Sequence, residues 1–288
     1  MSRNSGRTKA SASPAPTQAV DSTTTAAPPA TLSFVAPTEF VELPSRGKFY
    51  PPAHPLYEQE TIEIRYMTAK DEDILTSKAL LKSGLAIDRL IANLIVNKDI
   101  HVDDLLVGDK NALLLAARIS GYGNEYTVRI VCPACDVTNE HIFDLSAMGN
   151  SQGIQPEEDS DSGVSQTDHG TFTAVLPRSE YTVEFRLFTS QDEKDTIARQ
   201  ERLEKLNLPD STSTDLLKTL IVSVNNVTDV GEINNFVDNM PAQDARFLRA
   251  CVKVVTPNVD LSQEVECSSC GAVTETEVPF TSEFFWPK

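Results

Sequence analysis

The sequence predicts an α+β protein, in which a helical region and several β-hairpins are joined by a module built on four cysteines. Three observations lead to this prediction. Apolar residues recur at helical spacing in some segments and alternate with polar residues in others. Two Cys-x-x-Cys pairs lie far apart in the chain, and each falls at the turn of an expected hairpin.

The composition excludes several classes of protein. The chain has 288 residues, and its 25 Lys and Arg against 42 Asp and Glu give a formal net charge of -17. Binding to nucleic acid or to an anionic membrane surface needs a surplus of cations, so we expect neither partner. No apolar run approaches the roughly 20 residues of a membrane span. No apolar segment of the kind found in secretory signals follows Arg3, Arg7 and Lys9.

Composition also divides the chain into five expected regions. Residues 1–38 should form a disordered tail, because 22 of the first 30 residues are Ser, Thr, Ala, Pro or Gly. An acidic flexible loop is expected at 149–170. The regions between and after these are an N-terminal α+β region with the first cysteine pair (39–148), a hairpin and helical region (171–262), and the second cysteine pair with an aromatic C-terminus (263–288). No solenoid-type repeat is evident.

Spacing of apolar residues defines the first elements. Residues 61–66 alternate, which predicts a half-buried strand. A helix is expected at 68–82, because Thr68 and Asp71 form a capping-box pattern and a glycine follows its end. A second helix has apolar residues at helical spacing over 87–94. Two short helices should follow, the second with Asp109 as its N-cap and its end at Gly121.

From residue 125 the apolar period changes to two, which predicts three hairpins. The expected strand pairs are 125–131 with 139–145, 171–176 with 181–188, and 264–266 with 272–278. Helices are expected at 191–206 and 214–224. A last helix should begin with Pro241 as its first residue and end before Pro257.

The two cysteine pairs give the strongest chemical signal. A two-residue spacer lets both thiolates of a turn point at one ion, and two such turns form a closed tetrahedral site. We therefore expect a zinc-ribbon-like module with one structural zinc ion, although 131 residues separate the two pairs. Its expected ligands are Cys132, Cys135, Cys267 and Cys270. Redox chemistry, an iron centre and unligated thiols remain alternatives. The fifth cysteine, Cys251, is expected to be a small buried side chain.

No catalytic pattern emerges from the rest of the sequence. The four histidines (His54, His101, His141 and His169) are scattered, and phosphate-loop, dinucleotide-binding and nucleophile-elbow motifs are lacking. A zinc ion held by four thiolates has no open position for water. The chain is therefore expected not to be an enzyme.

Several motifs in combination resemble one known family. The segments ELPSRGKFYP (42–51), MTAKDEDIL (67–75), DLLVGDKN (104–111) and RISGYG (118–123), with the first cysteine pair, look like the N-terminal part of T-even-type bacteriophage baseplate hub proteins. The second cysteine pair and FFWP (284–287) add to the resemblance, whereas residues 149–262 match loosely.

This resemblance implies a non-catalytic structural subunit of a contractile-tail baseplate hub, located in the virion tail and assembled in the host cytoplasm. The implied partners are other hub or wedge proteins in a hetero-oligomeric assembly. Two other classes remain open: a cytoplasmic zinc-ribbon adaptor in transcription or replication, which predicts a basic surface patch, and an uncharacterised hydrolase, which predicts a pocket with a perturbed titratable group.

Overall fold

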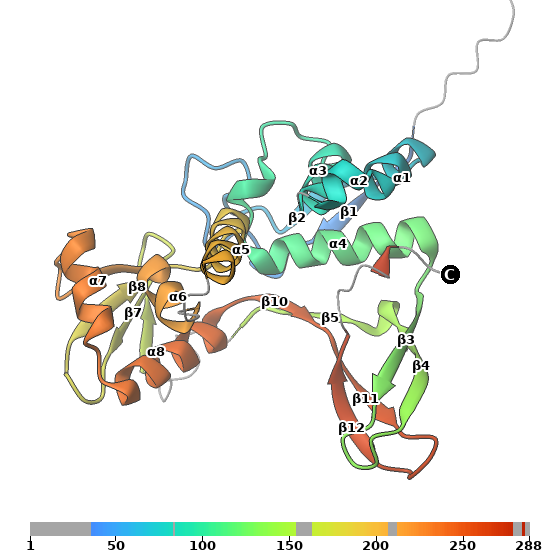
Figure 1. Ribbon diagram of the computed structural model, residues 1–288. Coiled ribbons are helices and arrows are strands. Elements are labelled where there is room, and N and C mark those ends of the chain that lie inside the picture. The colour runs from blue at the N-terminus through green and yellow to red at the C-terminus, as the bar shows by residue number, and fades with distance from the viewer. Residues whose placement is uncertain (1–35, 83, 154–162, 207–211, 279–283, 286–288) are drawn as a thin grey trace, which may run out of the picture. The chain divides into compact units, whose positions relative to one another are not determined.

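The computed structural model describes residues 36–82, 84–153, 163–206, 212–278 and 284–285, and Figure 1 shows how their helices and strands follow one another. Most of the expected tail (1–38) and the acidic stretch 154–162 lie outside the described residues, as do Phe280 and Trp286 of the aromatic C-terminus. Among the described helices, none has both the length and the apolar character that a bilayer crossing requires.

The described residues form helices and small antiparallel sheets, so the α+β prediction is confirmed. The α-helices are α1 (Ala69–Thr76), α2 (Lys78–Lys82), α3 (Ala86–Leu94), α4 (Val107–Tyr122), α5 (Ser190–Lys205), α6 (Thr212–Leu220), α7 (Val230–Asp238) and α8 (Ala242–Val255). The strands are β1 (Thr38–Glu42), β2 (Thr61–Arg65), β3 (Glu125–Val131), β4 (Thr138–Asp144), β5 (Gly149–Ser151), β6 (Val164–Gln166), β7 (Phe172–Val175), β8 (Thr182–Phe185), β9 (Ile221–Val224), β10 (Asn258–Asp260), β11 (Ser262–Glu266) and β12 (Val273–Glu277).

The strands pair in five sheets. Strands β6, β7, β8 and β9 form one four-stranded sheet in that order, and β1–β2, β3–β4, β5–β10 and β11–β12 are two-stranded. Two short strands, β5 and β6, thus lie within the segment 149–170. Buried side chains from most of these elements join one continuous apolar cluster, which also takes in Phe284 and Phe285 near the C-terminus.

The chain contains the same structural unit twice. We call residues 38–144 the first repeat and residues 172–277 the second repeat. Each begins with two antiparallel strands, continues into helices, returns to the second strand, and ends with a long helix followed by a cysteine hairpin. After the helices, the chain comes back beside the second strand. In the first repeat Ile95 forms a bridge with Ile64, and in the second Ile221 pairs with Phe185.

The clearest sign of the repeat is a shared hydrogen-bond network after the second strand. The Asp71 carboxylate accepts hydrogen bonds from the two terminal guanidinium nitrogens of Arg65 (2.6 and 2.8 Å) and from the backbone N–H of Thr68 (2.9 Å). Asp192 receives the same bonds from Arg186 (2.5 and 2.8 Å) and from the Thr189 N–H (3.0 Å). Both threonines form a capping box that starts α1 or α5, which confirms the capping box expected at Thr68.

The sequence carries this repeat over a short stretch only. Residues 61–72 and 182–193 are identical at six of twelve positions. The matching residues are Thr61, Glu63, Arg65, Thr68, Asp71 and Glu72 in the first repeat and Thr182, Glu184, Arg186, Thr189, Asp192 and Glu193 in the second. The repeat is a twofold one, so it differs from the solenoid type that the sequence lacks.

A second shared feature is a buried aspartate at the third residue of the long helix. Asp109 of α4 accepts hydrogen bonds from the Ser45 N–H (2.9 Å), the Ser45 hydroxyl (2.6 Å) and the Tyr50 hydroxyl (2.7 Å). Asp244 of α8 accepts from the backbone N–H groups of Arg178 (2.8 Å) and Ser179 (3.0 Å). In both repeats a Leu-Pro dipeptide precedes the turn that supplies these donors. Each aspartate therefore fastens its long helix to the first strand turn.

Several expected elements differ from the structure. Asp109 is not the N-cap of α4, because the helix starts at Val107 and the Asp109 carboxylate serves a distant turn instead. The expected helix 68–82 is interrupted at Ser77. The expected helix 214–224 ends at Leu220, and the next four residues form β9, because they pair with β8. Pro241 is the N-cap of α8 rather than its first helical residue. Strands β1 and β10 and helix α7 were not expected.

Asp71→Asn and Asp192→Asn should each lower the free energy of unfolding at pH 7 by about 1–3 kcal/mol, because each change weakens a charge-assisted network. Although burial opposes it, hydrogen bonding to arginine and threonine lowers the pKa of both carboxyl groups. The stability that each carboxylate contributes is thus present above pH of about 4 and is lost as the pH falls through its lowered pKa. Urea unfolding measures the effect. Asp73→Asn, on the exposed side of α1, is the matched control, and an equal loss in all three variants would contradict the prediction.

Candidate metal centre

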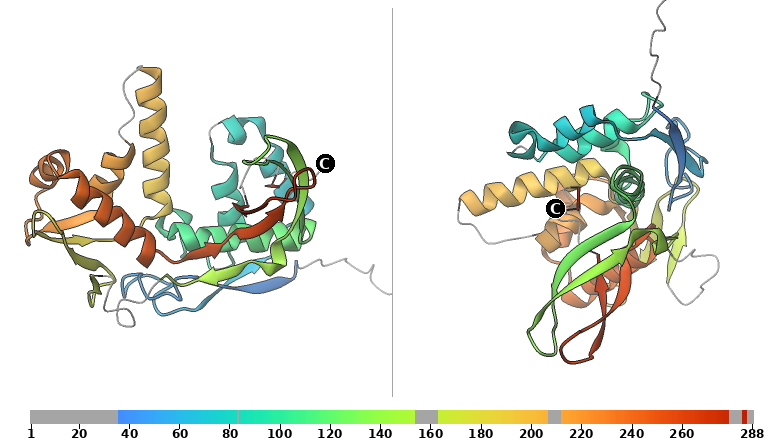
Figure 2. Two further views of the ribbon diagram at one scale, coloured as in Figure 1. Left: turned by 90° about the horizontal axis from the view of Figure 1, so that it is seen from below. Right: turned by 90° about the vertical axis from the view of Figure 1, so that its right-hand side faces the viewer.

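The four cysteines of the two Cys-x-x-Cys pairs come together at the tips of two hairpins. Strands β3 and β4 carry the first pair at their turn, and β11 and β12 carry the second. Figure 2 shows the two hairpins side by side, each with its turn at the same end. Each repeat therefore contributes one hairpin and two thiols.

The two turns have the same backbone conformation. The N–H of Cys132 donates to the Val137 carbonyl (3.0 Å), and the Cys132 carbonyl accepts from the Asp136 N–H (2.9 Å). In the second turn the N–H of Cys267 donates to the Ala272 carbonyl (2.9 Å), and its carbonyl accepts from the Gly271 N–H (2.9 Å). Asp136 (φ 57°) and Gly271 (φ 69°) hold the same left-handed position after the second cysteine of each pair.

The sulfur atoms lie at the spacing of a metal site. The Sγ atoms of Cys132 and Cys270 are 3.8 Å apart, and those of Cys135 and Cys267 are 3.7 Å apart. All four ligand atoms lie within 4.8 Å of one another. Both short contacts join one hairpin to the other, so the four sulfurs form a single cluster rather than two separate pairs.

This geometry fits a tetrahedral thiolate site. A Zn–S distance of about 2.3 Å corresponds to sulfur–sulfur edges of about 3.8 Å in a regular tetrahedron. A disulfide would bring two sulfurs to about 2.05 Å, and all five cysteines are free. Four thiolates are the donor set of structural zinc sites, and soft thiolates also suit other thiophilic ions. The cluster can therefore hold one metal ion.

Asn139 of β4 connects the two hairpins beside the sulfurs. Its amide Nδ2 donates to the Cys267 Sγ (3.3 Å) and to the Val137 carbonyl (3.0 Å), and its Oδ1 accepts from the Ser268 hydroxyl (2.5 Å). The amide is buried. Further from the tips, the Gln263 amide donates to the Asp144 carbonyl (2.9 Å) across the same two hairpins. These bonds orient the second cysteine turn against the first.

The thiols of Cys267 and Cys135 differ in pKa because their surroundings differ. The backbone N–H groups of Cys270 and Ser269 donate to the Cys267 sulfur and lower its pKa to about 6. The pKa of Cys135 is raised to about 12, because desolvation and the three neighbouring sulfurs outweigh a backbone hydrogen bond from Val137. Neighbouring thiolates disfavour one another's ionisation, and a cation between them would relieve this repulsion.

The remaining sequence-predicted residues lie elsewhere. Cys251 is buried in α8, and burial raises the pKa of its thiol to about 11, as expected for a packing residue. His141 lies on β4 with its ring 4.8 Å from that of Phe143, and it is not part of the sulfur cluster. Phe284 packs edge-to-face on Tyr126 at the base of the first hairpin and on Phe285, so these two terminal aromatics belong to the core.

The sequence predicts that Pro133 and Gly271 supply tight turn geometry, but the roles of Asn139 and of Asp136, which holds the position equivalent to Gly271, were missed. Asn139 is a single polar residue in an alternating strand, and only its buried position on the inner face distinguishes it. The left-handed turn position could have been found, because Asp and Gly are among the residues that tolerate it and both follow the second cysteine directly.

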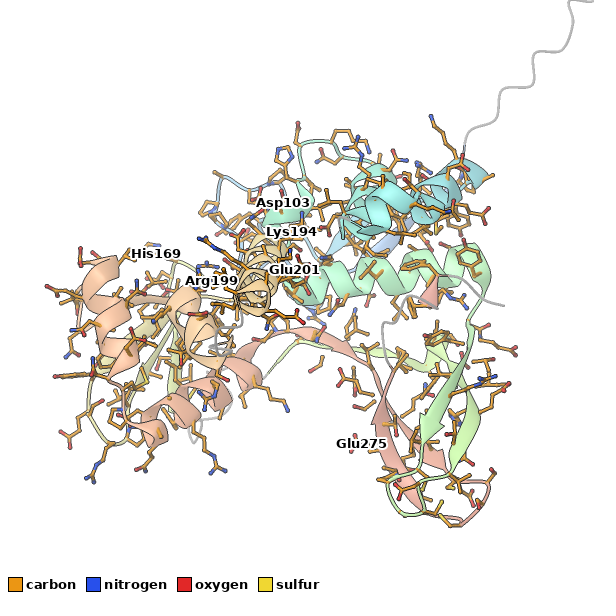
Figure 3. The ribbon with its side chains drawn as sticks, in the orientation of Figure 1. Asp103, His169, Lys194, Arg199, Glu201 and Glu275 are labelled. Carbon is orange, nitrogen blue, oxygen red and sulfur yellow. The ribbon has the colours of Figure 1, made fainter. Side chains whose placement is uncertain are left out.

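The outward faces of the hairpins carry acidic side chains. Glu264, Glu266, Glu275 and Glu277 are exposed on β11 and β12, and Figure 3 labels Glu275. Glu125, Glu140 and Asp144 are exposed on β3 and β4, where Arg129 is the one Lys or Arg residue. Such faces repel phosphate groups, which disfavours nucleic-acid binding through this module.

The fold and the sulfur cluster together define an acidic α+β protein with a twofold repeat and one group of four thiols that could hold a metal ion. A family model described as T4 bacteriophage base plate protein matches residues 36–286. The chain belongs to this family. Comparisons with curated proteins and with solved structures gave no significant match.

Family membership confirms the expectation of a phage baseplate protein. It supports a structural role in the virion tail, in assembly with other phage structural proteins. A structural baseplate family also agrees with the expectation that the chain is not an enzyme.

Gly271→Val should lower the free energy of unfolding by about 1–2 kcal/mol, because a β-branched residue is strained at positive φ. Gly271→Asn should cost less than half as much, since Asn tolerates this conformation. No atom lies within 4 Å of the place that a Cβ would take at Gly271, so the backbone alone produces the difference. Thermal or urea unfolding measures both variants, and equal losses for Val and Asn would contradict the prediction.

Proposed function

We propose that the protein is a structural subunit of a contractile-tail phage baseplate hub, acting in tail assembly through protein–protein contacts, with one structural zinc ion bound by Cys132, Cys135, Cys267 and Cys270. The observation that carries the zinc proposal is the single cluster of four sulfurs from two hairpins. Two of the sulfur–sulfur distances, 3.7 and 3.8 Å, match the edge of a tetrahedral site, and all four atoms lie within 4.8 Å of one another. When bound, zinc would neutralise the thiolates and cross-link the two hairpins.

The residues around the cluster support a structural role. Cys132 and Cys267 are buried, and Asn139 fixes the Cys267 sulfur from the opposite hairpin. Four protein sulfurs complete a tetrahedral shell, so no position remains for water or substrate. The hairpins have thin apolar interiors, and a cross-link at their tips supplies stability that these strands could not obtain from packing alone.

The hub position rests on the family match and on the resemblance to hub proteins, which covers about residues 40–148, the second cysteine pair and 284–287. We further propose that the subunit folds in the host cytoplasm, where reducing conditions keep the five cysteines available as thiols, and that it then joins other hub or wedge proteins. The domain division made from the sequence belongs to this proposal, except where the structure has strands: β1 begins at Thr38, and β5 and β6 lie within the expected acidic loop at 149–170.

Purified protein should contain about one zinc ion per chain, measured by mass spectrometry of the metal. Cys132→Ser and Cys270→Ser should each reduce the zinc content by at least about tenfold and lower the thermal midpoint, because three thiolates bind more weakly than four. Cys251→Ser is the matched control and should keep the zinc, since this thiol lies outside the cluster. Full zinc content in the first two variants would overturn the assignment.

Phage that carry Cys270→Ser should produce few infectious particles, and this chain should be depleted from purified tails, because an unfastened hairpin pair cannot hold the shape that its partners bind. Phage with Cys251→Ser should plaque normally. Quantitative mass spectrometry of purified tails, together with plaque counts, measures both effects. Normal infectivity of particles that contain the metal-free variant would contradict the proposed role.

A further inference from the structure

The two repeats contact each other through a short backbone ladder. We call residues 105–107, just before α4, the docking strand of the first repeat, and residues 188–190, at the start of α5, the cap loop of the second repeat. The Val107 N–H donates to the Phe188 carbonyl (3.1 Å), and the Ser190 N–H donates to the Leu105 carbonyl (2.8 Å). Leu106 and Thr189 form the antiparallel bridge between these bonds.

Charged side chains frame this ladder. The Lys110 ammonium lies 2.9 Å from Asp88 of its own repeat and 2.9 Å from Glu193 of the second repeat. Lys194 extends in the opposite direction, pairing with Asp88 at 2.9 Å and with Asp103, which Figure 3 labels beside it. Leu105 and Ser190 are fully buried, and Lys110 is only 7% exposed. Residues on both sides of the contact between the repeats are thus buried.

Because the unit occurs twice, each side of this contact has a second copy. The cap loop of the first repeat is 67–69, which precedes α1 and carries the same threonine–aspartate–arginine network as 188–190. The docking strand of the second repeat is 240–242, at the start of α8. Two observations make it equivalent to 105–107. A buried aspartate follows two residues after each segment. The residue just before each helix, Leu106 (φ -62°, ψ 142°) or Pro241 (φ -55°, ψ 136°), has the same backbone conformation.

Three residues of these second copies lie on the surface, whereas Met67 and Thr68 are half-buried like their counterparts Phe188 and Thr189. Ala69 is exposed, whereas its counterpart Ser190 is fully buried. Pro241 and Ala242 are exposed, whereas their counterpart Leu106 is 6% exposed and Val107 is half-buried. The chain therefore uses one copy of each surface internally and leaves the other copy of each open to solvent.

The open copies also have complementary charge. Glu72 on α1 corresponds to Glu193, the residue that accepts Lys110 in the internal contact, and it is exposed beside another acid, Asp73. On α8, exposed Arg246 lies one residue beyond the position equivalent to Lys110, and Arg249 follows on the next turn. A cation from α8 can thus face the acidic start of α1, as Lys110 of α4 faces the start of α5.

We propose that the docking strand of the second repeat (240–242) binds the cap loop of the first repeat (67–69) in a second copy of this chain, so that molecules join head to tail. The contact would repeat the internal ladder: the Ala242 N–H would donate to the Met67 carbonyl, and the Ala69 N–H to the Met240 carbonyl. Such a contact is heterologous, and it builds a ring or a filament according to the rotation between copies. It depends neither on the metal nor on the proposed place in the hub.

The test uses the full-length, metal-loaded protein in sedimentation velocity over a range of concentrations. The wild type should form dimers and larger species as concentration rises. Ala69→Arg blocks only the cap loop and Ala242→Arg only the docking strand, so each variant alone should associate at least about tenfold more weakly. A mixture of the two variants should form a dimer that does not grow, because one intact surface of each kind remains. Val230→Arg, on an exposed position of α7 (69% exposed), is the matched control and should associate as the wild type does.

A photo-cross-linking residue at position 69 should capture the peptide that contains 240–246, and mixing ¹⁵N-labelled with unlabelled chains shows that the two peptides come from different molecules. The far-ultraviolet spectrum and thermal midpoint verify that each variant is folded. A wild type that stays monomeric at every concentration, a mixture of the two variants that stays monomeric, or cross-links to a different region would each overturn the proposal. Zinc content is measured on the same samples, so failure of the metal assignment is distinguished from failure of this contact.

Discussion

Four sulfurs from two hairpins that are distant in sequence come together at one point, and this convergence constrains how the two halves of the chain are arranged. Cys135 and Cys267 are 132 positions apart in sequence, yet their sulfurs lie 3.7 Å from one another. The entropy of closing so long a loop grows only with the logarithm of its length, so the distance in sequence is a small obstacle. The larger requirement is orientation, because both turns must present two sulfurs to one point. The matched turn conformations and the Asn139 bridge meet that requirement.

The twofold repeat explains why such a convergence exists. Each repeat ends in a long helix and then a cysteine hairpin, so two copies of one local design supply two equal halves of the cluster. Half a cluster has two thiols and cannot complete a tetrahedral shell by itself. In the proposed metal site, each hairpin would therefore gain its full stability only where the two repeats meet. Fusion of the repeats in one chain makes that meeting intramolecular, at high effective concentration.

Local signals in the sequence were enough for the parts of the fold that depend on neighbours in the chain. The hairpins around both cysteine pairs, the capping box at Thr68 and the burial of Cys251 were all predicted, because alternation, capping spacing and an apolar helix context are local. Asp109 shows where such signals stop. An aspartate near a helix start is typical of an N-cap. The Asp109 carboxylate instead accepts hydrogen bonds from Ser45 and Tyr50, more than 55 residues earlier in the chain.

The strand β9 was not predicted for a related reason. Its residues continue the apolar pattern of α6 without a break, and only pairing with β8 decides that they are extended. The twofold repeat was not predicted from the sequence, because its two copies differ in length at two places. Residues 43–60 separate the first two strands in the first repeat, where a short turn (176–181) suffices in the second, and α7 occurs only in the second repeat. What remains alike is the strand-to-helix junction, where arginine, threonine and aspartate are fixed by hydrogen-bond chemistry.

The differences between the repeats also show which features the chain needs twice. The Arg–Asp–Thr junction and the buried helix aspartate are present in both copies, because each one fixes a helix to its own sheet. The inter-repeat ladder forms once inside the chain, because two repeats in a row share a single boundary. A tandem duplication of a unit with a head and a tail always leaves one head and one tail unpaired. In an assembly protein these two surfaces lie where a neighbouring copy can bind, and the internal boundary specifies the geometry of that contact.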